Sequence, residues 1–117
     1  MNTPLSAIIY FAVAALVGAI GQFLYKNGAD AADGGWTTYV LNIQLLGGVA
    51  CYIGVMVLFV AAFKQGGALT VLYPIYASTF IWAAVIAWKA YGTPITWTNV
   101  AGMLFLIVGM YLLGRQA

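Results

Sequence analysis

Residues 4–25 read PLSAIIYFAVAALVGAIGQFLY and contain no charged side chain. A helix rises 1.5 Å per residue, so about 20 apolar residues cross a hydrocarbon core roughly 30 Å thick. Three further uncharged stretches meet this requirement, at residues 44–63, 69–88 and 95–114. The sequence therefore predicts an all-α membrane protein, one domain over residues 1–117, with four transmembrane helices and both termini on the same side of the membrane.

The composition excludes most other classes of protein. Only 5% of the residues are charged, whereas a soluble domain carries about a quarter. A net charge of +2 is too small for a nucleic-acid-binding surface. Without His and with a single Cys, the chain lacks the residues of a zinc site or of a Ser-His-Asp or Cys-His centre. We expect neither an enzyme, nor a metal or cofactor, nor a nucleic-acid partner.

One face of the first span is small in its middle and polar at one end. Gln22 and Lys26 are four residues apart on this face, so an amide and an ammonium approach the same membrane boundary. The face either packs against another helix or holds a polar or anionic group. Tyr52 in the second span also needs a partner for its hydroxyl. The residues of the face are Tyr10, Ala14, Gly18, Gly21, Gln22 and Tyr25.

The third span is the least lipid-like of the four, because it carries several hydroxyls. Tyr73 and Tyr76 are three residues apart, and Trp82 follows further along the span. These side chains line a cavity or serve helix packing. Pro74 lacks a backbone donor and clashes with the preceding turn, so we expect a bend or hinge at residues 70–74.

The fourth span carries a seam of small residues. Gly102 and Gly109 are seven residues apart, which places them two turns apart on one side of the helix. Small residues let another membrane helix approach closely. We therefore expect this seam to form a dimer interface.

Several features, taken in order, resemble the drug/metabolite transporter superfamily. The likeness is greatest to its four-helix members, the small multidrug resistance exporters and the paired small subunits of the aminoarabinose-lipid flippase. It covers nearly the whole chain. The features are Gly21-Gln22-x-x-x-Lys26, Tyr73-Pro74, Lys89 followed by Pro94, and Gly102 to Gly109.

The resemblance implies two different activities. Small multidrug resistance proteins are antiparallel dimers in which a first-helix glutamate binds a cation and protons in turn. Aligning Lys26 with that family's lysine puts Gly18 at the glutamate position, so that route is absent here. Tyr52, Tyr73 and Tyr76 match aromatic binding-site positions of the family. The flippase subunits also lack the glutamate, and they imply movement of a polyprenyl-phosphate-linked sugar across the inner (plasma) membrane.

Three functions remain open from the sequence. The first is flippase-like transport of a lipid with a polar headgroup, and the second is export of a hydrophobic cation or metabolite. The third is a non-transporting assembly partner of another membrane protein. The expected partners are membrane lipid, a lipid-linked or small amphipathic substrate, and either a second copy or a paralogous four-helix chain. The candidate substrate-binding residues are Gln22, Lys26, Tyr52, Tyr73, Tyr76 and Trp82, with Pro74 as the hinge.

The basic residues give the chain no preferred orientation. Lys26 and Lys89 lie on one side of the predicted bundle, and Lys64 and Arg115 on the other. Topology follows the Lys and Arg counts of the loops, so we expect insertion in both directions and an antiparallel homodimer. A cysteine label at the C-terminus should then be reached from both sides of the membrane. Labelling from one side only would exclude the antiparallel homodimer and indicate a partner chain.

Overall fold

A computed structural model describes residues 3–115, and this part of the chain contains helices and no β-strand. Four membrane-crossing segments are formed, by α1, by α3, by α4 together with α5, and by α6. They confirm the prediction of an all-α chain with four helices long and apolar enough to span a bilayer. The helices are α1 (Leu5–Ala31), α2 (Trp36–Val40), α3 (Ile43–Lys64), α4 (Leu69–Tyr76), α5 (Thr79–Tyr91) and α6 (Trp97–Gly114).

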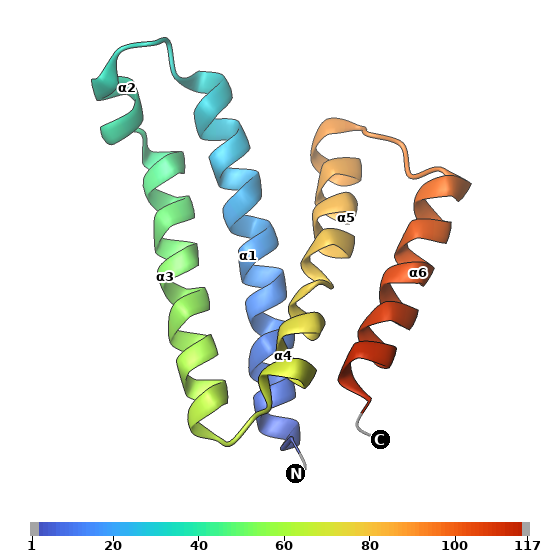
Figure 1. Cartoon of the computed structure of the whole chain (residues 1–117). Helices are drawn as coiled ribbons and strands as arrows, with labels where there is room; N and C mark the ends of the chain where they lie inside the picture. Colours follow the sequence, from blue (N-terminus) through green and yellow to red (C-terminus); the bar gives the residue numbers. More distant parts are fainter. Residues whose placement is uncertain (1–2, 116–117) are drawn as a thin grey trace.

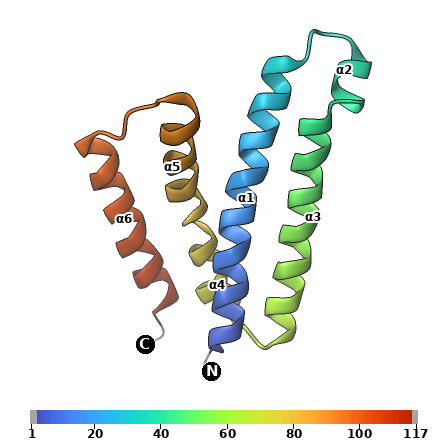
Figure 2. The same ribbon diagram turned by 180° about the vertical axis from the view of Figure 1, so that it is seen from behind.

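The start of α1 and the end of α6 lie at the same end of the molecule, as predicted (Figure 1). The segment containing α2 and the connection between α5 and α6 lie at the opposite end. Helices α1 and α3 pack against each other most extensively, and both α4 and α5 also pack against α1. Helix α6 packs chiefly against α4, and seen from behind it stands at the edge of the bundle (Figure 2).

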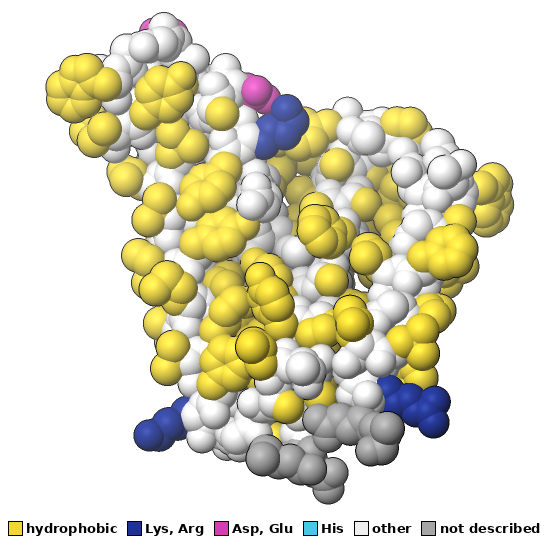
Figure 3. All heavy atoms as spheres, viewed as in Figure 1, with side chains coloured by type: hydrophobic (Ala, Val, Ile, Leu, Met, Phe, Trp, Pro, Cys, Tyr) yellow, Lys and Arg dark blue, Asp and Glu magenta, His cyan; other side chains and the backbone are white. Residues whose placement is uncertain are grey.

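The buried core lies where α1, α3 and α4 meet. It contains Phe11 from α1 and Leu72 from α4, both fully buried, together with Ala7 and Ala62. The ring of Phe11 stacks on that of Phe59, with the ring centroids 4.3 Å apart. Outside this core, apolar side chains face outward, while Lys and Arg gather at the two ends of the molecule (Figure 3). This distribution fits a chain surrounded by lipid over its middle.

Helix α1 is longer than the sequence predicts, because its last turns are covered by the start of α3. Asn27-Gly28 is typical of a turn, yet both residues are helical. A β-carbon at Gly28 would lie 2.7 Å from Leu45 Cγ, so only glycine permits this contact. Asn42 Nδ2 also donates to the Gly28 carbonyl at 2.8 Å. These contacts with α3 outweigh the local turn preference, so Lys26 lies within α1 and not in a loop.

The third span is interrupted after Pro74 and not before it, which corrects the expected bend at residues 70–74. Pro74 lies inside α4, and the regular helix stops at Ala77 and Ser78. There the Ala77 amide donates to the Pro74 carbonyl at 2.9 Å, which is an i to i−3 bond and tightens the turn. Tyr76, the last residue of α4, contacts Gly18 of α1 and Phe59 of α3.

Glycines set the close approach of α1 to α3. A β-carbon at Gly48 would collide with the Tyr25 ring and lie 3.1 Å from the Gly21 carbonyl. A β-carbon at Gly21 would lie 2.8 Å from the Tyr52 ring. Tyr25 and Tyr52 stack on each other, with ring centroids 5.4 Å apart. The two glycines therefore make room for this tyrosine pair.

Gly48→Ala and Gly54→Ala should shift stability in opposite directions. Both residues lie within α3, but a β-carbon at Gly54 meets nothing within 4 Å. Gly54→Ala gains up to about 1 kcal/mol of helix propensity. Gly48→Ala forces the stacked Tyr25 ring aside and should cost about 1–3 kcal/mol. Thermal unfolding of both variants in detergent measures the difference, and equal shifts would contradict the close packing.

Candidate functional site

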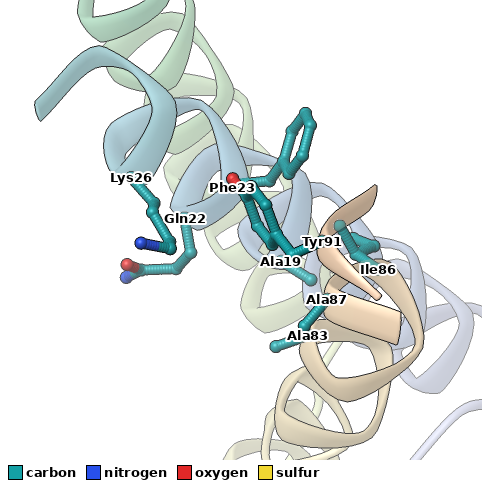
Figure 4. Close-up of a pocket in the computed structure, with 8 residues that line it drawn as sticks. All are labelled: Ala19, Gln22, Phe23, Lys26, Ala83, Ile86, Ala87 and Tyr91. Carbon is teal, nitrogen blue, oxygen red and sulfur yellow. The ribbon is translucent and has the colours of Figure 1, made fainter. Parts of the chain in front are cut away.

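A pocket of about 130 Å³ lies between α1 and α5, toward the end of the molecule that carries α2 (Figure 4). Its walls are mainly apolar, and Gln22, Lys26 and Tyr91 bring polar groups to it. Gln22 and Lys26 therefore share a pocket, as their spacing on one helical face predicts. The lining residues are Ala19, Gln22, Phe23 and Lys26 from α1 and Ala83, Ile86, Ala87 and Tyr91 from α5.

The ammonium of Lys26 has a nearby acidic partner and an aromatic neighbour. Lys26 Nζ lies 3.2 Å from Asp30 Oδ2 and 5.4 Å from the centroid of the Tyr91 ring. The two charged side chains are 57% and 65% exposed, respectively. An exposed pair at this helical spacing contributes only about 0.3–0.5 kcal/mol. This ion pair therefore adds little to stability.

The hydroxyl of Tyr91 donates to Asn27 Oδ1 and so joins the end of α5 to α1. Tyr91 also lines the pocket, whereas Asn27 does not. From the sequence alone, Tyr91, Asn27 and Asp30 were not candidates for the site. The spacing of Lys26 and Asp30 could have indicated their ion pair, because residues four apart on a helix are neighbours. No local pattern pairs Asn27 with Tyr91, which lies 64 residues further along the chain.

Gln22 is also hydrogen-bonded to Tyr52 of α3. Gln22 Nε2 donates to the Tyr52 hydroxyl at 2.6 Å, and that hydroxyl donates to the Gly18 carbonyl at 3.2 Å. Tyr52 thus has the partner that its place in a membrane span requires. It stands behind Gln22 and does not line the pocket between α1 and α5.

Tyr76 fills the space beside Gly18. A β-carbon at Gly18 would collide with the Tyr76 hydroxyl and lie 3.1 Å from its Cζ. The Tyr76 ring also meets Phe59 edge-on, with centroids 5.1 Å apart. A glutamate at position 18, the position that the resemblance matches to the exporters' carboxylate, would require Tyr76 to move.

The remaining predicted site residues do not line this pocket. Tyr73, Pro74 and Tyr76 line a second hollow of about 390 Å³ on the side of α6. Trp82, which is 41% exposed, lines neither this hollow nor the pocket between α1 and α5. The structure therefore brings Gln22 and Lys26 to one pocket and hydrogen-bonds Tyr52 to Gln22. Tyr73 and Trp82 lie outside this group.

The Gly102 and Gly109 seam borders a third hollow, of about 270 Å³, between α6 and α4. Pro74 and Ala77 form part of its opposite wall. A β-carbon at either glycine would meet nothing within 4 Å. Contacts within this chain therefore do not account for the two glycines.

Comparisons with known proteins leave the family resemblance as a prediction. No protein-family model matches the chain, and no curated protein or solved structure matches it either. Within residues 3–115 there is no group of His, Cys, Asp and Glu side chains able to hold a metal ion.

Gly18→Ala should destabilise the chain, and Tyr76→Phe should relieve much of that loss. The phenol oxygen is the atom nearest to a β-carbon at position 18, and removing it leaves a contact of 3.1 Å. We expect a coupling free energy of about 1 kcal/mol between the two sites, measured by a double-mutant cycle in detergent unfolding. Tyr73→Phe is the matched control, because Tyr73 is 61% exposed. Additive effects of Gly18→Ala and Tyr76→Phe would contradict this contact.

Proposed function

We propose that the chain is a small membrane transporter that moves a lipid with a polar, phosphate-bearing headgroup, in the manner of the flippase subunits it resembles. The observation that carries this proposal is the exposed Lys26 ammonium at the rim of an apolar pocket in a membrane span. Typical pockets for drug-sized ligands measure about 300–1,000 Å³, so a volume of about 130 Å³ suits a headgroup. The lipid tail would remain in the bilayer.

Each polar group at the pocket has a role in this proposal. Lys26 acts as a point charge on the phosphate, taking it in exchange for Asp30. Tyr91 and Asn27 hold α5 against α1, which keeps the pocket in shape. The apolar walls exclude water and so strengthen the attraction between ammonium and phosphate.

Alternating access would use the interruption of the third span at residues 77–78. Both halves of the span, α4 and α5, pack against α1, but α6 packs chiefly against α4. A movement at residues 77–78 would therefore carry α4 and α6 relative to α5. Rocking of one group of helices against another around a membrane site is common in transporters with internal repeats. A second copy, or a paralogous four-helix chain, would dock on the Gly102 and Gly109 seam and supply the other half.

A second candidate function is export of a hydrophobic cation. The hollow beside α6 is lined by Tyr73, Tyr76 and Phe80, and its volume of about 390 Å³ lies within the range of ligand pockets. Aromatic faces attract organic cations. The third possibility is an assembly partner without transport activity, and the open seam on α6 is the feature that favours it.

Lys26→Ala should weaken binding of polyprenyl phosphate by about 10-fold or more, because a hydrogen bond to a charged group contributes about 1.5–3 kcal/mol. Lys64→Ala is the matched control, since Lys64 is also exposed at a helix end but lines none of the pockets described. Intrinsic tryptophan fluorescence in detergent measures the binding. The neutral polyprenol should bind both variants equally.

Two outcomes would overturn the proposal. Equal losses in Lys26→Ala and Lys64→Ala would mean that Lys26 is only an anchor reaching the membrane surface. Binding of tetraphenylphosphonium that is lost in Tyr76→Ala and retained in Lys26→Ala would assign the chain to cation export. Lipid movement in proteoliposomes separates either transporter from an assembly partner.

A further inference from the structure

We infer that the pocket between α1 and α5 selects a headgroup that carries a hydrogen-bond donor beside its anionic group, and that Tyr52 is the residue that sets this selectivity. The inference rests on the proposed role of this pocket as a headgroup site. Tyr52 does not line the pocket and acts only through Gln22.

The direction of the hydrogen bonds fixes the amide of Gln22. A backbone carbonyl oxygen accepts hydrogen bonds and never donates them. The Tyr52 hydroxyl therefore donates its single proton to the Gly18 carbonyl, 3.2 Å away. The same hydroxyl then accepts from its other neighbour, the Gln22 amide, at 2.6 Å. Gln22 must therefore turn its nitrogen to Tyr52, which leaves its carbonyl oxygen, Oε1, facing away from that bond.

Oε1 of Gln22 is an acceptor without a hydrogen bond among the described residues, and the Gln22 side chain is exposed. A ligand can therefore reach this oxygen and donate a hydrogen bond to it. Gln22 and Lys26 are one helical turn apart on the pocket wall. The site thus offers one cation and one acceptor from residues one helical turn apart. A phosphodiester whose neighbouring carbons carry hydroxyls matches both groups, because the phosphate reaches Lys26 while a hydroxyl donates to Gln22.

Tyr52 is itself held in place by packing. Its ring stacks on Tyr25 with centroids 5.4 Å apart, and a β-carbon at Gly21 would lie 2.8 Å from it. The phenol oxygen therefore has little freedom to follow a rotating amide. Without this oxygen, the amide of Gln22 is free to turn over and present its N–H groups to the pocket, so the preference for a donor should disappear.

Two lipids of equal charge test the selectivity. Phosphatidylglycerol and phosphatidylmethanol both carry one phosphodiester charge, but only the first has headgroup hydroxyls. Vesicles of phosphatidylcholine containing either lipid, with brominated chains, would be reconstituted with the full chain, and tryptophan quenching would give the two relative affinities. We expect wild type to favour phosphatidylglycerol about five-fold, the ratio given by one neutral hydrogen bond.

The variants separate the hydroxyl of Tyr52 from its ring. Tyr52→Phe keeps the ring and should bring the ratio of the two lipid affinities close to one. Gln22→Leu should have the same effect while residue 52 remains tyrosine. The double variant should add nothing further. Tyr25→Phe is the matched control, because it removes a hydroxyl from the stacked ring but leaves the chain from Gln22 to Gly18 intact.

The outcomes distinguish this inference from the proposed function. The selectivity is overturned if wild type binds phosphatidylglycerol and phosphatidylmethanol equally, or if Tyr25→Phe lowers the affinity ratio as much as Tyr52→Phe does. In either case the headgroup site still stands if binding depends on Lys26. If Lys26→Ala leaves the binding of both lipids unchanged, the headgroup site itself is overturned. A ratio lost in Tyr52→Phe and Gln22→Leu but kept in Tyr25→Phe supports the inference.

Discussion

The close approach of α1 to α3 is the contact on which the candidate site depends. Gly21 and Gly48 allow it, and the tyrosine pair of Tyr25 and Tyr52 fills the remaining space. Because Tyr52 is held there, its hydroxyl meets the amide of Gln22. The packing of α1 against α3 thereby holds the amide of a residue that also lines the pocket between α1 and α5.

The charged groups of the site lie at the membrane boundary and are not buried. Lys26 and Asp30 are both more than half exposed, so their attraction is weakened by water and salt. A phosphate held against the apolar wall of the pocket would meet the ammonium in a less polar environment, where the same attraction is stronger. The ion pair within the chain is therefore weak enough to be replaced by a ligand. The Tyr91 ring lies near the Lys26 ammonium and carries no charge that would compete with an anionic ligand.

Helix α6 packs chiefly against α4 and contains no buried residue, for a physical reason. Lipid tails are as apolar as leucine side chains, so no hydrophobic force drives one membrane helix against another. Close packing must come from small residues or from hydrogen bonds, as it does between α1 and α3. On α6 the small residues Gly102 and Gly109 border an open hollow and touch no neighbour within 4 Å of a β-carbon. The same seam is available to a second chain.

The sequence by itself determined the number of spans, the ends that carry the charges and the placing of Gln22 and Lys26 on one face. Each follows from a local rule, either the length needed to cross a bilayer or the period of a helix. The tertiary structure alone decided that Gly28 stays helical under Leu45 and that Tyr91 meets Asn27. It also decided that Tyr76 lies over Gly18 and that the third span is interrupted after Tyr76. In a soluble protein the apolar side of a helix marks the core, but here most of the surface of each span is apolar, so only the packed helices show which residues meet.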